Sequence, residues 1–140
     1  MSLYVLDTDV LSLHRLGHPK VQQHVRQHPP SDLAATVLTV EEQLAGWFTR
    51  LRRAKDRSQL AVAYQRLTDT VAHLGQFQLL TFTEPAILRY EGLLAQKLGV
   101  GKMDLRIAAV VLENAAVLVS RNLRDFSRVP GLRRRHCGMR

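Results

Sequence analysis

Features that would point to a secreted or membrane-bound protein are nearly absent from this sequence. It has a single cysteine, Cys137, so no intramolecular disulfide can form, which is typical of proteins in a reducing cytosol. It has no run of eighteen apolar residues, so no segment is predicted to cross a membrane. Residues 1–6 lack the charged, apolar and small-residue regions of a signal peptide. We therefore expect a cytoplasmic protein that does not bind membranes.

Acidic residues are scarce relative to basic ones. There are 12 Asp and Glu residues against 20 Lys and Arg residues, a formal net charge of +8. Such an excess favours polyanionic partners such as nucleic acids, although a solvated helix face or a solubilising tail produces the same count. The basic residues gather in two groups, Arg50, Arg52, Arg53, Lys55 and Arg57, and then Arg121, Arg124, Arg128, Arg133, Arg134, Arg135 and Arg140.

Length and composition indicate one globular domain. A chain of 140 residues can bury a hydrophobic core, and 46% hydrophobic with 23% charged residues is typical of a folded domain. The sequence contains no internal repeat, low-complexity segment or linker. We predict one domain spanning residues 1–140.

Short apolar runs alternate with helical patterns along the chain. Strands are predicted at residues 3–6, 33–38, 77–82, 116–119 and near 132–135. Helices are predicted at residues 10–16, 20–27, 39–53, 57–74, 86–98 and 102–115. This alternation predicts an α/β fold in which a parallel sheet has helices on both faces.

Helix starts are predicted from capping patterns. Thr8 or Asp9 is expected to cap the first helix. Thr39 and Glu42 have the spacing of a capping box, which places the start of the third helix at Thr39. In the helix at 102–115, Leu105 falls outside the apolar face given by the helical period.

Acidic side chains recur where a predicted strand ends or a following helix begins. In a parallel α/β domain these places lie along one edge of the sheet, so the acids are able to converge. Converging carboxylates repel one another and their pKa values rise unless a cation neutralises them. Oxygen ligands of this kind suit Mg²⁺ or Mn²⁺. The acids are Asp7, Glu42, Asp104, and Asp125 with its neighbour Asn122.

Each acid also has a structural explanation. A carboxylate in the first turn of a helix is stabilised by the helix dipole by roughly 0.3–1 kcal/mol, which would account for Glu42 or Asp104 taken singly. Asp7 is harder to explain in this way, because an acid at the end of a buried strand is costly unless it is used or paired. The residue pattern alone leaves a metal site and a structural role open.

Four segments together carry a family resemblance. They are residues 4–11 (YVLDTDVL), 39–46 (TVEEQLAG), 103–109 (MDLRIAA) and 118–131 (LVSRNLRDFSRVPG). In this order and spacing they resemble the PIN-domain ribonucleases, and within them the toxins of VapBC-type toxin–antitoxin pairs. The resemblance covers nearly the whole chain and implies a single PIN-like domain, with a parallel sheet of about five strands flanked by helices on both faces.

The resemblance assigns roles to the acids. Asp7, Glu42 and Asp104 match the family's three core metal-binding acids. The fourth position is variable in the family and falls on Asp125 or Asn122; we favour Asp125, with Asn122 assisting. The resemblance therefore implies that all four acids are catalytic and bind the metal.

Neighbouring residues depart from the family or extend the site. Asp9 stands where the family often has asparagine or serine, so it either adds a ligand or caps the first helix. Ser120 replaces a commoner threonine and keeps the hydroxyl. Lys102, Arg121 and Arg124 are expected to position the RNA backbone.

The resemblance implies a metal-dependent endoribonuclease acting as the toxin of a type II toxin–antitoxin system. Mg²⁺, or Mn²⁺ in its place, would activate a water that hydrolyses RNA phosphodiester bonds. It also implies a homodimer or larger hetero-assembly, in which a cognate antitoxin blocks the active-site groove. Two alternatives remain at this point: a nucleic-acid-binding regulatory module without turnover, and a structure-specific DNA nuclease that uses the same acids.

Overall fold

A five-stranded parallel sheet forms the centre of the computed structural model, which describes residues 2–137. The strand order is β3-β2-β1-β4-β5, so the first strand along the chain lies in the middle. Val5 of β1 is in register with Ala34 of β2 on one side and Leu118 of β4 on the other. The predicted α/β fold with a parallel sheet is confirmed. The strands are β1 (Tyr4–Leu6), β2 (Leu33–Thr36), β3 (Gln78–Leu80), β4 (Val117–Ser120) and β5 (Arg134–His136).

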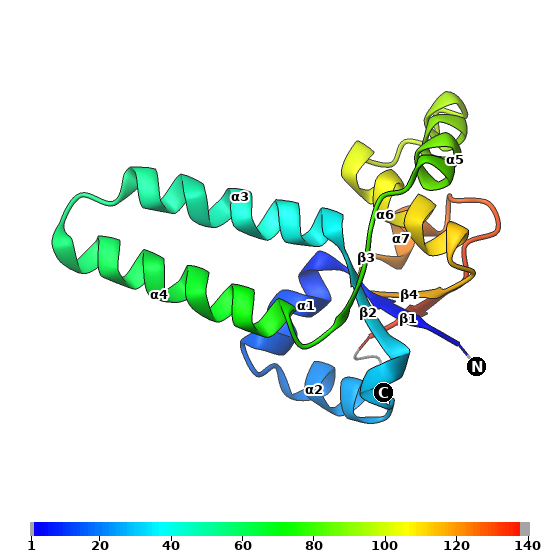
Figure 1. Cartoon of the computed structure of the whole chain (residues 1–140). Helices are drawn as coiled ribbons and strands as arrows, with labels where there is room; N and C mark the ends of the chain where they lie inside the picture. Colours follow the sequence, from blue (N-terminus) through cyan, green and yellow to red (C-terminus); the bar gives the residue numbers. More distant parts are fainter. Residues whose placement is uncertain (1, 138–140) are drawn as a thin grey trace.

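Helices cover both faces of the sheet (Figure 1). The described residues form α1 (Thr8–Arg15), α2 (Pro19–Arg26), α3 (Val37–Arg53), α4 (Arg57–Leu74), α5 (Glu84–Ala95), α6 (Lys102–Glu113) and α7 (Leu123–Phe126), with a short 3₁₀ turn at Pro30–Asp32. Successive strand residues point to opposite faces. Val5 therefore packs with residues of α5 and α6, and Leu6 packs with residues of α1 and α2. Among residues 2–137, no helix has the length and apolar character needed to cross a membrane.

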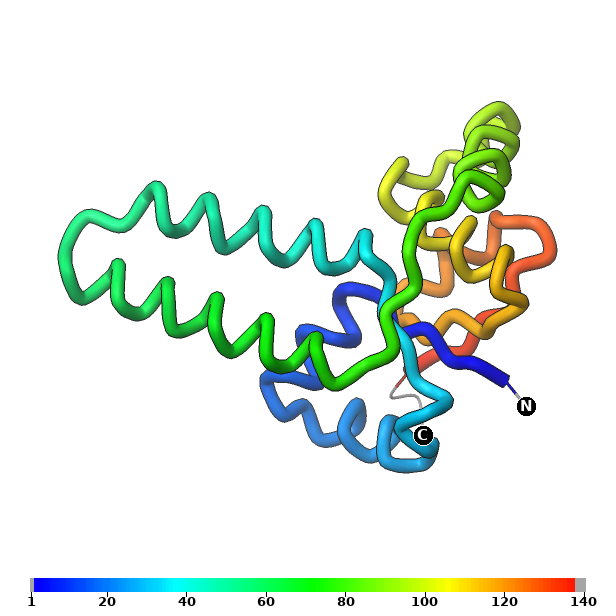
Figure 2. Tube along the Cα trace, in the orientation of Figure 1, coloured from blue at the N-terminus to red at the C-terminus, as the bar shows by residue number. Residues whose placement is uncertain are grey.

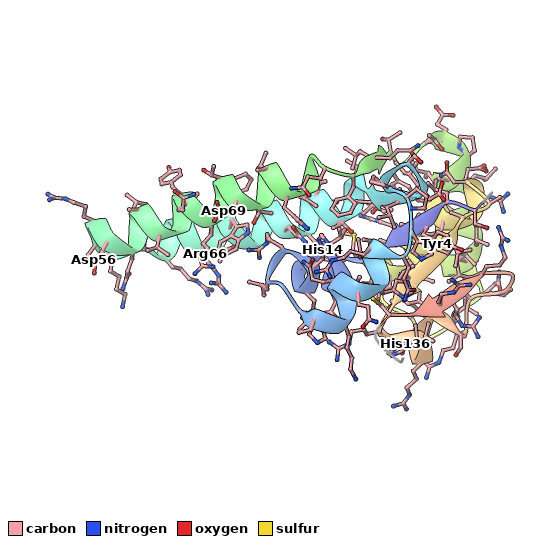
Figure 3. All side chains as sticks on the ribbon, turned by 90° about the horizontal axis from the view of Figure 1, so that it is seen from below. Tyr4, His14, Asp56, Arg66, Asp69 and His136 are labelled. Atoms are coloured by element: carbon pink, nitrogen blue, oxygen red, sulfur yellow. The ribbon has the colours of Figure 1, made fainter. Side chains whose placement is uncertain are left out.

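The α3–α4 pair projects from the sheet as a long antiparallel arm (Figures 1 and 2). Asp56, the N-cap of α4, lies at its tip, and Arg66 and Asp69 lie along α4 (Figure 3). At the root of the arm, Nδ1 of His14 and Nε2 of His73 are 2.8 Å apart, a hydrogen bond that joins α1 to α4. The arm is thus anchored at one end only and exposes both helices along most of its length.

The first helix starts differently from the prediction. Asp7, rather than Thr8 or Asp9, caps α1, because its Oδ1 accepts a 2.9 Å hydrogen bond from the Val10 N–H. The Asp7 N–H still donates to Val119 of β4, at 3.1 Å. Asp7 therefore belongs to the sheet through its backbone and to α1 through its side chain.

The third helix begins two residues earlier than predicted, at Val37. Thr36 caps it, and its Oγ1 accepts a 3.2 Å hydrogen bond from the Thr39 N–H. The predicted capping box of Thr39 and Glu42 is wrong, because pairing of β2 with β3 ends at Thr36 and places that hydroxyl at the helix start.

Burial on α6 extends further around the helix than its period suggests. Leu105 is 2% exposed, so its predicted place outside the apolar face is wrong. The reason is that α6 packs against both β4 and α5, so that Leu105 and every residue from 107 to 111 are buried. The short helix α7, after β4, is an element that the sequence patterns did not indicate.

Candidate active site

Asp7 is the most buried of the predicted site acids, with 6% of its surface exposed. Its pKa is raised from the usual 3.8 to about 6. Burial is the largest cause and the charges of Asp9 and Asp104 add to it, whereas hydrogen bonds from Ser120 and from the Val10 N–H act in the opposite direction. A carboxyl group of this kind holds its negative charge at a cost at neutral pH.

Asp104 links the four acids electrostatically. It lies half-buried in the first turn of α6, and its pKa is raised first by burial and then by the charges of Glu42 and Asp125. Because its charge also acts on Asp7, Asp104 interacts with each of the other three. The structure therefore brings the four predicted acids within range of one another's charges, from the starts of α1, α6 and α7 and the second turn of α3.

Glu42 and Asp125 are each held by a neighbouring polar side chain. Glu42 is half-buried on α3, and its Oε1 accepts a 2.6 Å hydrogen bond from the Thr8 hydroxyl. Asp125 accepts a 3.1 Å bond at Oδ2 from the Nδ2 of Asn122. Asn122 thus orients Asp125, and its part in metal binding stays a prediction.

The acids are neighbours without forming a closed ligand set. Among residues 2–137, no group of three or more His, Cys, Asp or Glu side chains is gathered closely enough to hold a metal ion as it stands. Two carboxylates shift each other's pKa at separations that are too long for both to bind the same ion, because charge interactions have a longer range than metal coordination. The donors nevertheless fit a hard divalent cation in kind: all are carboxylates, and two have pKa values raised by burial and mutual charge.

The other predicted residues lie around this group. Asp9 is exposed in the first turn of α1, next to Asp7. Ser120 is fully buried at the end of β4, where its Oγ accepts a 2.8 Å bond from the Asn122 N–H. Lys102, Arg121 and Arg124 are exposed, and each lies within two residues of Asp104, Asn122 or Asp125 along the chain.

The two basic groups occupy different parts of the surface. The first is exposed around the tip of the arm, from residues 50 to 57. The second follows β4 and is exposed from residue 121 to residue 135, and its last member, Arg140, lies outside the described residues. Only the second group is close in sequence to the acids of the site.

Three residues near the acids have surroundings that the sequence patterns did not indicate. The Thr8 and Thr39 hydroxyls, 2.9 Å apart, stand beside Glu42, whereas these residues were expected to serve as helix caps. Cys137 is fully buried, and its pKa is raised to about 11 by burial and by the charge of Asp7. A hydroxyl residue directly after a predicted site acid was the available signal for Thr8.

Comparison with known proteins identifies the fold. No protein-family model matches the sequence, and no curated protein matches it. Among solved structures, the chain is similar to DNA-bound VapBC from Salmonella typhimurium, with a TM-score of 0.79, 21% identity and coverage of 97% of this chain and 98% of that one. The chain has a PIN-like fold. VapBC-1 from nontypeable Haemophilus influenzae has a TM-score of 0.68, 25% identity and coverage of 96% and 97%.

The PIN-like fold extends over the whole compared length. VapBC-5 from Mycobacterium tuberculosis, a member of the VapBC family of toxin–antitoxin systems, has a TM-score of 0.55, 20% identity and coverage of 98% of each chain. The resemblance to VapC-type PIN domains, predicted from four sequence segments, is confirmed in the fold. At these identities the likeness concerns the fold, and the activity has to be argued from the residues of the site.

Proposed function

We propose that this chain is a metal-dependent endoribonuclease and the toxin of a type II toxin–antitoxin pair. One observation carries the proposal: in a PIN-like fold, Asp104 lies near enough to Asp7, Glu42 and Asp125 for their charges to interact, although the four acids are far apart in sequence. A net charge of +8 supports a polyanionic substrate. Carboxylates without a cation would repel RNA, so the acids and the basic surface together favour metal-assisted phosphodiester hydrolysis.

The site residues divide into metal ligands, supports and substrate contacts. Asp7, Glu42 and Asp104 would hold Mg²⁺ or Mn²⁺, with Asp125 as the fourth acid. When bound, the cation supplies charge that activates water and stabilises the leaving oxygen of a phosphodiester. The Val10 N–H keeps the Asp7 carboxylate in place at the start of α1.

Around the acids, exposed cationic side chains would bind the RNA backbone. Lys102, Arg121 and Arg124 are able to contact phosphate oxygens, which fixes the register of the RNA without reading its bases. Asn122 keeps Asp125 oriented through the 3.1 Å hydrogen bond. In this proposal the basic side chains position the RNA, and the acidic side chains hold the metal ion.

We further propose a cognate antitoxin as partner and a homodimer, or a larger hetero-assembly, as the resting state. The solved structures with this fold include toxin–antitoxin complexes, which supports such a partner. The antitoxin would cover the acidic groove. A separate cleft of about 790 Å³ lies between α3 and α4 of the arm, next to the end of α1, and none of the four acids lines it. It offers the antitoxin a second contact that combines Trp47 and Val62 with Arg50 and Arg66. The single buried thiol, Cys137, fits a cytoplasmic location.

Cleavage of a cellular RNA pool by the purified chain tests the proposal. We expect discrete fragments with Mg²⁺ or Mn²⁺, none with EDTA, and at least a hundredfold loss in Asp104→Asn, because that acid interacts with all three others. Asp69→Asn is the matched control, since Asp69 is an exposed acid on the arm bonded to Gln65. Wild-type cleavage by Asp104→Asn would overturn the assignment.

The acids' open arrangement favours one alternative, a nucleic-acid-binding module without turnover. If this alternative holds, EDTA does not change RNA binding, and no shortened RNA products are formed. Running RNA and DNA of the same sequence side by side also tests for a structure-specific DNA nuclease, which would cut only the DNA.

A further inference from the structure

Two threonine hydroxyls form a short chain that ends on Glu42. The Thr8 Oγ1 lies 2.6 Å from Glu42 Oε1 and 2.9 Å from Thr39 Oγ1. Thr8 is the first residue of α1, whereas Thr39 and Glu42 lie three residues apart on one face of α3. These two hydrogen bonds therefore connect the starts of two helices that each contribute a site acid.

The direction of the hydrogen bonds follows from the number of protons. An ionised carboxylate only accepts, so the single hydroxyl proton of Thr8 points to Glu42. The bond between the threonines must then be donated by Thr39. Thr39 is fully buried, and a buried hydroxyl without a partner is costly, so its bond to Thr8 keeps Thr8 oriented.

Neither hydroxyl is needed for helix capping. Asp7 caps α1, and Thr36 caps α3 by accepting from the Thr39 N–H. The contact between α1 and α3 also has a second polar bridge, from Gln43 Nε2 to Ser12 Oγ at 3.2 Å. The Thr8–Thr39 pair is therefore free to act on Glu42 rather than on the helices.

We propose that Thr8 and Thr39 are positioning residues that fix the Glu42 carboxylate relative to Asp7. Thr8 directly follows Asp7, whose carboxylate is already held by the Val10 N–H. The bond from Thr8 thus sets the separation of two acids that belong to different helices. A carboxylate has a second oxygen, so the bond to Oε1 leaves Glu42 able to bind a cation. This inference rests on the proposed function.

The test measures divalent-metal binding by titration calorimetry with Mn²⁺, alongside RNA cleavage. Thr8→Val removes the hydroxyl at nearly constant volume. We expect about a tenfold or greater loss of Mn²⁺ affinity, the scale found when a group that orients a metal ligand is removed. The kcat should fall with it while the KM for RNA changes little, since the phosphate contacts lie elsewhere. Thr8→Ser should restore most of the affinity, and Thr39→Val should lower it in the same direction by a smaller factor.

The control is Thr70→Val, which removes another fully buried threonine hydroxyl, bonded at 2.8 Å to a carbonyl within α4. It should leave Mn²⁺ affinity at the wild-type level. In a Glu42→Gln background, Thr8→Val should have no further effect on metal binding. If Thr8→Val fails to fold, Thr39→Val decides the matter, because it removes the hydroxyl that orients Thr8 and leaves the Thr8 hydroxyl in place.

The possible failures are distinguishable. If Asp7→Asn abolishes metal binding but Thr8→Val and Thr39→Val bind Mn²⁺ as the wild type does, the positioning role is overturned and the proposed function stands. If Asp7→Asn also binds as the wild type does, the metal site itself is wrong. An equal loss in Thr70→Val and Thr8→Val would reduce the role of Thr8 to general packing.

Discussion

Replacing Asp7 by asparagine should stabilise the metal-free protein at neutral pH. Folding raises the pKa of Asp7 from 3.8 to about 6 through burial. Each pKa unit corresponds to about 1.4 kcal/mol, so ionised Asp7 lowers the free energy of unfolding by about 3 kcal/mol. Asparagine has no charge to desolvate, and its amide oxygen is still able to accept the hydrogen bond from the Val10 N–H. We expect the free energy of unfolding of Asp7→Asn to exceed that of the wild type by about 3 kcal/mol at pH 8.

The stability difference between the wild type and Asp7→Asn should depend on pH. Because the folded pKa is raised, folded Asp7 binds a proton at pH values where the unfolded chain has lost it. The wild type therefore gains stability relative to Asp7→Asn as the pH falls through 6. The gain is complete below pH 3.8. At pH 4 the difference between the two proteins should be below about 1 kcal/mol.

Urea unfolding in EDTA at pH 8 and at pH 4, followed by circular dichroism, measures both values. Asp9→Asn is the matched control, because Asp9 is exposed in the same helix turn. Removing its charge should change stability by no more than about 1 kcal/mol, because loss of the helix-dipole interaction is opposed by relief of its repulsion with Asp7. Equal stability of wild type and Asp7→Asn at pH 8 would refute the argument that burial of this carboxylate is costly.

Three further outcomes are expected. Between pH 6.5 and 4, His73→Gln should lose less stability than the wild type, as measured by urea unfolding. The pKa of His73 is lowered to about 4, by burial first and then by the charges of His14 and Arg15, so unfolding takes up a proton in this pH range. Leu118→Ala, in the middle of the sheet, should cost about 2–5 kcal/mol in the same assay, whereas Leu88→Ala, 70% exposed on α5, should change stability by no more than about 0.5 kcal/mol. Native Cys137 should not react with a thiol reagent at pH 8 until urea unfolds the chain, because burial raises its pKa to about 11.

The fold was largely predictable because its elements have strong local signals. The helix predicted at residues 57–74 coincides with α4, which has regular apolar spacing and ends at the C-cap Gly75. The central strands were found because short apolar runs with valine or leucine suit a sheet buried on both faces. Their ends were less accurate, as for β2, which stops at Thr36 where its pairing stops.

The remaining errors concern choices that depend on tertiary contacts. Three hydroxyl or acid groups near the start of α1 were able to cap it, and only the geometry of the exit from β1 selects Asp7. Leu105 is buried because a second helix covers that side of α6, which no period within α6 reports. The Thr8–Glu42 bond joins residues 34 positions apart, and for this reason it was not foreseen.

The central place of β1 has a consequence for synthesis of the chain on the ribosome. β1 is translated first, yet its neighbour β4 is translated more than a hundred residues later, and Asp7 bonds to Val119 through its backbone. The middle of the sheet therefore lacks one of its two neighbours until residues 117–120 have left the exit tunnel. A nascent chain already carries Asp7 and Glu42, but they lack Asp104 and Asp125. For the proposed nuclease, which would be made beside ribosomal and messenger RNA, this order of translation postpones assembly of the acids until residue 125 has emerged.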